Sequence, residues 1–172
     1  MIKNNLTHYY KQHKWLRVFS QLLLFLLIVI VVRTWQSRDY IEGAAPIIVG
    51  TTLNAQVIDL RTPRSQPLLV HFWAVWCRIC QFENPTIARL AENYSVISIA
   101  SWSEGEAQVR EYLKQQNLNF PVIVDEDGEW AKVYGVRAVP TSFIVDTNGD
   151  IRFIETGYTS EWGLRLRLWW AE

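Results

Sequence analysis

Cys77 and Cys80 constrain this chain more than any other feature, because they lie three positions apart and no other cysteine is present. They therefore cannot belong to a wider disulfide framework or to a four-cysteine zinc site. The pair closely follows an apolar run at residues 68–72, and its spacing indicates redox chemistry. A permanent disulfide closing so short a loop would stabilise little, and a partial metal site would find a third ligand only in His71.

Composition narrows the class of protein further. Seventeen basic and seventeen acidic residues balance to a formal net charge of zero, so nothing indicates a polyanionic partner, and we expect no nucleic acid. Aromatic residues make up 13% of the chain, with eight glycines and six prolines. This balance is typical of a packed globular domain rather than a fibrous or disordered chain.

An apolar segment near the N-terminus predicts a membrane anchor. Residues 22–32 are an unbroken run of Leu, Phe, Ile and Val, and with its flanks the segment 18–35 reaches the roughly 17 to 20 residues that span a bilayer. Small residues that would mark a cleavage site lie too far downstream, which favours an uncleaved signal anchor. More basic residues precede the segment than closely follow it, so residues 1–17 are expected in the cytoplasm.

The remaining chain would then face outward, in the periplasm of a bacterium, from a single-pass anchor in the inner membrane. Residues 36–50 mix charged residues with Gly43 and Pro46 without a sustained period, which predicts a linker. Residues 51–172 are long enough for one domain. Disulfide bonds can form and persist in that compartment, because it is oxidising.

Helix and strand patterns that alternate along the chain predict an α/β domain. Helix patterns begin near Cys77, at Ser103 with Glu106 as a capping box, and at residues 129 and 160. Short apolar runs between and after these helices indicate strands at residues 68–72, 96–100, 120–124, 142–145 and 151–156. We expect a mixed sheet flanked by helices, in the order β-α-β-α-β-α-β-β-α.

Residues 72–80, with Val139-Pro140-Thr141 further along, resemble the thioredoxin superfamily. The helix and strand inserted between residues 101 and 126 are similar to the membrane-anchored, extracytoplasmic branch of TlpA and ResA. Residues 157–170 resemble the ScsD (suppressor of copper sensitivity) group. The resemblance covers about residues 50–172. It implies a thioredoxin fold and thiol–disulfide exchange with protein substrates, with no cofactor and an inner-membrane redox partner.

The two cysteines have distinct expected roles. Cys77 lies at a helix N-terminus, where free N–H groups favour a thiolate, so it is the predicted nucleophile. Cys80 would resolve the mixed disulfide, and the pair would cycle through a Cys77–Cys80 disulfide. Arg78 would shift Cys77 further toward thiolate, or else be a solvated side chain that shapes the partner surface.

The resemblance implies further site residues. Pro140 corresponds to a cis-proline beside the cysteines, although alone it would suggest a trans proline that begins an edge strand. Val139 would pair through its backbone with an extended substrate, and Thr141 and Trp76 would contact that substrate. His71 stands where thioredoxin has a buried acid. It is either a proton-transfer group or a neutral core histidine bonded to nearby backbone.

Several alternatives stay open. The reductase interpretation, in periplasmic redox or copper-stress protection, competes with an oxidase, a cytochrome c maturation protein and a non-catalytic binding module. Thr141 and Ser142 follow Pro140 where haem-maturation reductases carry a glutamate, which disfavours that role. Copper scavenging is also possible, yet we expect no dedicated metal site, because Met1 is the sole methionine.

The remaining polar and aromatic residues are expected to be structural. Glu83, Arg89 and Lys132 are interpreted as surface charges without a role. A stripe on the last helix would either pack that helix on the sheet or form a docking or membrane-surface patch. Its members are Trp162, Arg165, Leu166, Arg167, Trp169 and Trp170.

Overall fold

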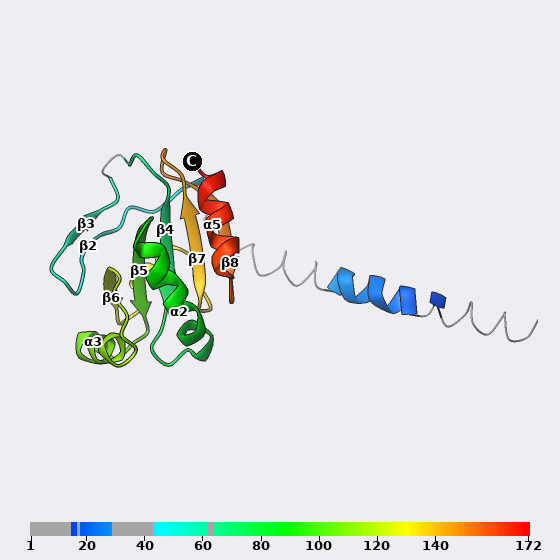
Figure 1. The fold of residues 1–172 in the computed structure, drawn as a ribbon, viewed down its shortest axis with the longest axis horizontal. Helices are drawn as coiled ribbons and strands as arrows, with labels where there is room; N and C mark the ends of the chain where they lie inside the picture. Colours follow the sequence, from blue (N-terminus) through cyan, green and yellow to red (C-terminus); the bar gives the residue numbers. More distant parts are fainter. Residues whose placement is uncertain (1–14, 17, 29–42, 62–63) are drawn as a thin grey trace, which may run out of the picture. The chain divides into compact units, whose positions relative to one another are not determined.

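The computed structural model describes residues 15–16, 18–28, 43–61 and 64–172. The chain forms two units, Met1–Asp39 and Tyr40–Glu172 (Figure 1). In the first, residues 15–16 and 18–28 are helical and expose their large apolar side chains. Among the described residues, no helix is both long and apolar enough to cross a bilayer. Residues 29–35 of the predicted anchor lie outside the described ranges.

The second unit contains a mixed six-stranded sheet with the order β1-β8-β7-β4-β5-β6. Strand β4 is parallel to β5 and antiparallel to β7, and β5 is parallel to β6. The strands of the sheet are β1 Gly43–Ala44, β4 Leu68–Trp73, β5 Ser95–Ser101, β6 Val122–Asp125, β7 Thr141–Val145 and β8 Asp150–Thr156. The helices of this unit are α2 Arg78–Ala91, α3 Gly105–Gln115, α4 Glu129–Val133 and α5 Glu161–Trp170. The predicted order from β4 to α5 is confirmed.

Strand β4 lies at the centre of two hydrophobic cores. Leu69 and Trp73 pack with residues of α2, α3 and α5 on one face. Val70 and Phe72 pack with residues of α4 on the other face, and Figure 1 shows α2 and α5 together on their side of the sheet. All six residues of β4 are buried. A strand covered on both faces reads as a continuous apolar run, which is why residues 68–72 show no alternation.

The predicted linker 36–50 is wrong for its second half, because residues 43–50 belong to the folded domain. Strand β1 pairs antiparallel with β8. Strand β2, Val49–Thr51, forms a two-stranded sheet with β3, Val57–Asp59. Ile48 has no exposed surface. These short segments have no period of their own, and long-range pairing and burial order them.

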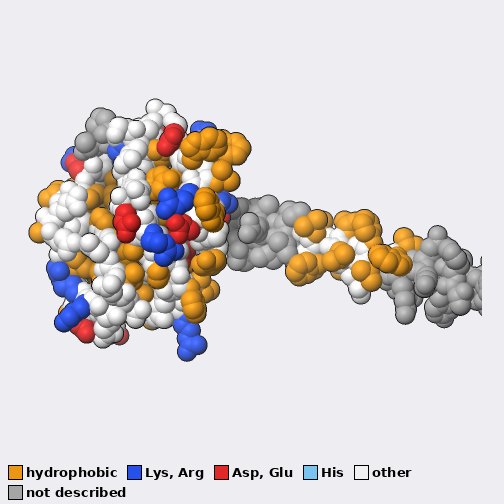
Figure 2. Space-filling model, viewed as in Figure 1, with side chains coloured by type: hydrophobic (Ala, Val, Ile, Leu, Met, Phe, Trp, Pro, Cys, Tyr) orange, Lys and Arg blue, Asp and Glu red, His pale blue; other side chains and the backbone are white. Residues whose placement is uncertain are grey.

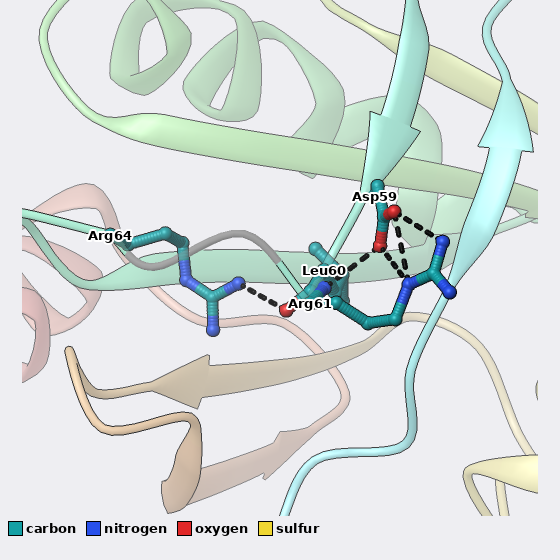
Figure 3. Close-up of polar contacts among 4 residues, drawn as sticks. All are labelled: Asp59, Leu60, Arg61 and Arg64. Atoms are coloured by element: carbon teal, nitrogen blue, oxygen red, sulfur yellow. Dashed lines mark hydrogen bonds and ion pairs between the residues drawn. The ribbon is translucent and has the colours of Figure 1, made fainter.

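A group of charged residues follows β3 (Figure 3). The Asp59 carboxylate accepts the backbone N–H of Arg61 at 2.9 Å and its guanidinium at 2.6 Å. Hydrogen bonds from Arg61 lower the pKa of Asp59 to about 2. Arg64 donates to the Leu60 carbonyl at 3.2 Å. This region lies by the start of β4, whereas the cysteines follow the end of β4.

The predicted capping box of the second helix is wrong. Helix α3 begins after Glu104, which forms no side-chain cap. Ser103 Oγ instead accepts the Val75 N–H at 3.3 Å, so it fastens the loop before the cysteines. Gln108 Oε1 accepts the Glu104 N–H at 3.0 Å, and thus bonds one of the free N–H groups at this end of the helix.

Gly128→Ala should destabilise the domain more than a glycine change in open space. Gly128 has a φ of +72°, and a Cβ there would collide with the Trp102 indole. Gly157 has a φ of +83°, and a Cβ there would meet nothing within 4 Å. We expect Gly157→Ala to lose about 1–2 kcal/mol from the left-handed backbone alone. Gly128→Ala should lose about 1–3 kcal/mol more from overpacking.

Urea unfolding of the two variants and the wild type measures this difference. Equal losses in both variants would show that Trp102 moves aside without penalty, contrary to this prediction.

Candidate active site

The cysteines lie where β4 ends and α2 begins. Cys77 is the N-cap of α2, and its Sγ accepts the Cys80 N–H at 3.2 Å. This arrangement directs a helix N-terminal N–H at the sulfur, where it stabilises a thiolate. The Cys77 thiol also donates to the Val139 carbonyl at 3.4 Å. Both cysteines are free thiols.

The two sulfurs differ in their surroundings. Cys77 keeps 7% of its surface exposed, whereas Cys80 has none. Burial, followed by its hydrogen bond with Cys77, raises the pKa of the Cys80 thiol well above its usual range. Cys80 therefore holds its proton until a base takes it. This asymmetry matches an attacking Cys77 and a resolving Cys80.

Glu83 is not the surface charge expected from the sequence, because its side chain is fully buried on α2. Its Oε1 accepts the Thr159 N–H at 3.2 Å, and Oε2 has no hydrogen-bond partner. Burial raises the pKa of Glu83 to about 7, and the Thr159 N–H opposes the shift. The charge of Glu83 also contributes to the raised pKa of Cys80. A buried carboxyl group with a pKa near neutrality thus influences the pKa of the resolving thiol.

His71 is fully buried on β4, on the face that carries Leu69 and Trp73. Its Nδ1 lies 2.9 Å from Ser142 Oγ, so its partner is a side chain rather than backbone. Burial lowers its pKa to about 3, and the Asn84 side chain partly opposes this shift. His71 is therefore neutral at physiological pH. The structure supports a core histidine over a proton-transfer group.

Asn84 forms a second buried polar contact in this core. It is fully buried on α2, and its Nδ2 donates to Tyr112 Oη at 3.1 Å. Tyr112 on α3 stacks against Trp73 with ring centroids 5.3 Å apart. One buried hydrogen bond thus joins β7 to β4, between Ser142 and His71, and another joins α2 to α3, between Asn84 and Tyr112. His71 Nε2 and Asn84 Oδ1 have no hydrogen-bond partner. Buried polar groups linked in this way hold the packed elements in one arrangement.

The Val139–Pro140 peptide bond is cis. This loop lies beside the cysteines, because the Val139 carbonyl accepts the Cys77 thiol. Thr141 is fully buried and its hydroxyl donates to the Ala138 carbonyl at 2.8 Å. Its side chain thus holds the loop, and any part of Thr141 in substrate binding falls to the backbone.

Exposed apolar side chains border the buried sulfurs. Trp76 is 62% exposed, yet its indole N–H donates to the Trp102 carbonyl at 2.8 Å, which fixes the ring. Ile79 and Phe82 on α2 are 49% and 78% exposed. Arg78 is exposed on the first turn of α2, so solvent screens its charge. Its effect on Cys77 stays a prediction.

This arrangement favours thiol–disulfide exchange over metal binding. A nucleophilic sulfur at a helix N-terminus has a buried resolving sulfur one turn away and a buried base on the next turn. Across the described ranges, no three His, Cys, Asp or Glu side chains gather to hold a metal ion.

Sequence reasoning missed Glu83 and Asn84, although a signal for both was present. The apolar stripe of this helix includes Ile87 and Leu90. Glu83 lies four residues before Ile87 and Asn84 lies three residues before it. Cys80 lies three residues before Glu83. Helical spacing thus places all three on the buried face. What spacing alone does not reveal is that the loop between β8 and α5 contacts Glu83, through the Thr159 N–H.

Glu83 and His71 should influence stability in opposite directions. Folding raises the pKa of Glu83 from 4.5 to about 7, so the folded state holds the extra proton and the free energy of unfolding falls as pH rises between these values. Folding lowers the pKa of His71 from 6.5 to about 3, so the free energy of unfolding rises with pH in that window. Between pH 4.5 and 6.5 the two slopes oppose each other. Each is at most about 1.4 kcal/mol per pH unit.

Glu83→Gln should therefore unmask the His71 slope in the reduced protein. We expect its free energy of unfolding to rise more steeply than that of the wild type from pH 4.5 to 6.5. Glu92→Gln, an exposed carboxylate beside the same helix, is the matched control and should follow the wild type. Urea titrations at several pH values in the presence of a phosphine reductant give the slopes. Identical slopes in all three proteins would contradict the buried, protonated Glu83.

Comparisons with known proteins show the family of this chain. The family model described as AhpC/TSA family matches residues 41–154. A thioredoxin-like protein of Haemophilus influenzae is 36% identical over 124 residues, covering 72% of this chain and 71% of that protein. The thiol-disulfide oxidoreductase ResA of Bacillus thuringiensis is 34% identical over 123 residues, covering 69% of this chain and 70% of ResA.

Solved structures show the same fold. StoA from Bacillus subtilis superposes with a TM-score of 0.60 at 24% identity, covering 70% of this chain and 95% of StoA. A thiol:disulfide interchange protein from Chlorobium tepidum gives a TM-score of 0.65 at 22% identity, covering 77% and 98%. The expected thioredoxin fold is thereby confirmed. With its Cys77–Cys80 pair, this chain belongs to the AhpC/TSA family as a thiol–disulfide oxidoreductase of the ResA type.

Proposed function

We propose that this protein is a membrane-tethered, extracytoplasmic reductase of protein disulfides. The observation that carries the proposal is the contrast between Cys77, which caps α2 and keeps 7% of its surface exposed, and Cys80, which is fully buried near Glu83. A disulfide of a folded or partly folded protein can reach Cys77 but not Cys80. The apolar rim of Trp76, Ile79 and Phe82 offers such a partner a contact surface.

The reaction proceeds in two exchanges. The Cys77 thiolate attacks one sulfur of the substrate disulfide, forming a mixed disulfide and releasing the other substrate sulfur as a thiolate that takes up a proton. Glu83 then accepts the Cys80 proton, and the Cys80 sulfur attacks the Cys77 sulfur. The second substrate thiolate leaves. The substrate gains two electrons, and the protein is left with a Cys77–Cys80 disulfide.

Glu83 suits the second step better than His71 does. A general base works best when its pKa lies near the working pH, and burial brings the pKa of Glu83 to about 7. The pKa of His71, at about 3, leaves the imidazole a poor proton acceptor near neutrality.

The cellular setting rests on the sequence. The apolar segment 18–35 supports a single-pass inner-membrane anchor, and the basic residues before it support a periplasmic domain. An inner-membrane partner would return electrons to the oxidised pair. The likeness of residues 157–170 to the ScsD group supports a place in copper-stress protection.

An oxidase is the second candidate. Arg78 lies one residue after Cys77, where its charge would stabilise the Cys77 thiolate and thus the reduced form. A couple with a more stable reduced form donates its disulfide more readily.

Cys80→Ala should trap substrates covalently. Without its resolving sulfur, the mixed disulfide at Cys77 cannot be released by internal attack. Membranes from cells that produce this variant should contain mixed-disulfide adducts, which are visible on non-reducing gels and are reduced by dithiothreitol. Cys77→Ala is the matched control and should trap little, because Cys80 is buried. A binding module would yield no adducts with either variant.

The resting redox state decides between reductase and oxidase. We expect the pair to be mostly reduced in cells, since a reductase must be recharged between turnovers. Acid quenching followed by alkylation with a mass tag measures this by gel shift. A mostly oxidised pair would reverse the proposed direction while leaving the exchange chemistry intact.

A further inference from the structure

Helix α5 has two apolar faces. Leu164 and Leu168 are fully buried and pack into the core that contains the cysteines. On the other side, the face here named the Trp face is exposed to solvent. Its members are Trp162 at 82%, Leu166 at 54%, Trp169 at 64% and Trp170 at 69% exposed. Surface helices ordinarily turn polar residues outward, so a second apolar face indicates a second partner.

The Trp face resolves one alternative left open by the sequence. The tryptophans of the last helix do not pack it on the sheet, because the intervening leucines do so. Figure 2 shows hydrophobic side chains gathered on the side of the domain where Figure 1 places α5. Exposed apolar patches of this kind mark interaction surfaces.

The charges beside the Trp face are already paired. Glu161 accepts Arg89 at 2.8 Å and Arg165 at 2.9 Å. Arg89 and Arg165 thereby lower the pKa of Glu161. The Arg165 guanidinium also lies 5.5 Å from the centre of the Tyr94 ring. A surface with its charges internally matched offers little steering for a strongly charged protein partner.

A shallow hollow of about 600 Å³ accompanies the Trp face. It is bordered by Tyr94, which lies between α2 and β5, and by residues of α5. Most of its exposed lining is apolar, with Glu161 and Arg165 at the edge. Indole rings with an apolar body and a polar N–H are enriched where lipid headgroups meet acyl chains.

We propose that the Trp face of α5 rests on the lipid bilayer to which the chain is tethered. This inference depends on the membrane attachment proposed above. The apolar helical residues 18–28 are separated from β1 by residues 29–42. Fourteen residues extend at most about 50 Å, so a bilayer that holds the first unit is always within reach of the domain. Tryptophan-rich helix faces bind such surfaces through their apolar area.

Bilayer contact would restrict how the cysteines face their partners. Helix α2 carries Cys80 and Glu83, and the Arg89–Glu161 ion pair joins α2 to α5. A fixed α5 therefore limits the orientations of α2 relative to the membrane. A recharging partner embedded in the same bilayer would meet Cys77 from a narrower range of directions.

Quenching of tryptophan fluorescence by brominated lipid tests the contact. The full chain is reconstituted into vesicles of phosphatidylethanolamine and phosphatidylglycerol, with and without bromine on acyl carbons near the headgroups. A triple variant carries Trp162→Ser, Trp169→Ser and Trp170→Ser. Trp76→Ser removes an equally exposed tryptophan beside the cysteines and serves as the control. Leu166→Glu keeps all nine tryptophans and places a charge in the Trp face.

The amount of emission lost to bromine should fall clearly in the triple variant and in Leu166→Glu, and stay at the wild-type level in Trp76→Ser. Equal losses in all four proteins would overturn the proposal. So would a Trp-face blue shift that depends on protein concentration rather than on lipid, because it would show contact between copies of this chain.

Flotation of the same vesicles distinguishes a failure of the membrane attachment from a failure of the Trp-face contact. A chain that does not float with lipid lacks the proposed attachment, and the Trp-face contact falls with it. A chain that floats but shows no Trp-face quenching loses this inference alone. Trapping by Cys80→Ala reports on exchange chemistry independently of both results.

Discussion

Burial of β4 on both faces is the constraint on which the rest of the structure depends. The strand separates the two cores and runs between a parallel and an antiparallel neighbour. Its end fixes where the chain turns into α2, so Cys77 becomes the N-cap at the edge of the sheet. The cis bond before Pro140 lies next to it because β7 pairs with β4. The reactive sulfur thus takes its position from a strand that is buried on both faces.

The same burial produces the electrostatics beneath the cysteines. Cys80, Glu83 and His71 have no exposed surface, and desolvation disfavours the charged form of each. The pKa values of the thiol and the carboxyl rise, and that of the imidazole falls. At neutral pH only Glu83 stands near its titration point. The buried region beneath the cysteines therefore contains a thiol that keeps its proton and a carboxyl group whose pKa lies near neutrality.

Helix α5 connects this buried region to the surface. Its approach brings the Thr159 N–H to Glu83 and the Glu161 carboxylate to Arg89. Its leucines complete the core, while its tryptophans face solvent. The loop before α5 thus contacts Glu83, the proposed base, and the outer face of α5, in the proposed arrangement, contacts the bilayer. A displacement of α5 by a partner on its outer face can in this way be transmitted through packing to the surroundings of Glu83 and Cys80.

Local sequence patterns predicted much of this architecture. The strand and helix order, the Cys77–Cys80 pair and the start of α5 near residue 160 follow from apolar periodicity and residue spacing. The incorporation of residues 43–50 does not follow, because β1 gains its order by pairing with the distant β8. Ser103 similarly serves Val75 rather than its own helix.

The sequence by itself determined which residues react, since two cysteines three positions apart before a helical pattern leave few other interpretations. Tertiary structure decided which neighbouring polar residue can exchange a proton near neutral pH. Glu83 and His71 are both polar residues in apolar surroundings, and sequence spacing does not measure how much water each loses. The folded core buries both, makes His71 a neutral link to Ser142, and leaves Glu83 as the titrating neighbour of Cys80, because desolvation depends on every element packed around a site.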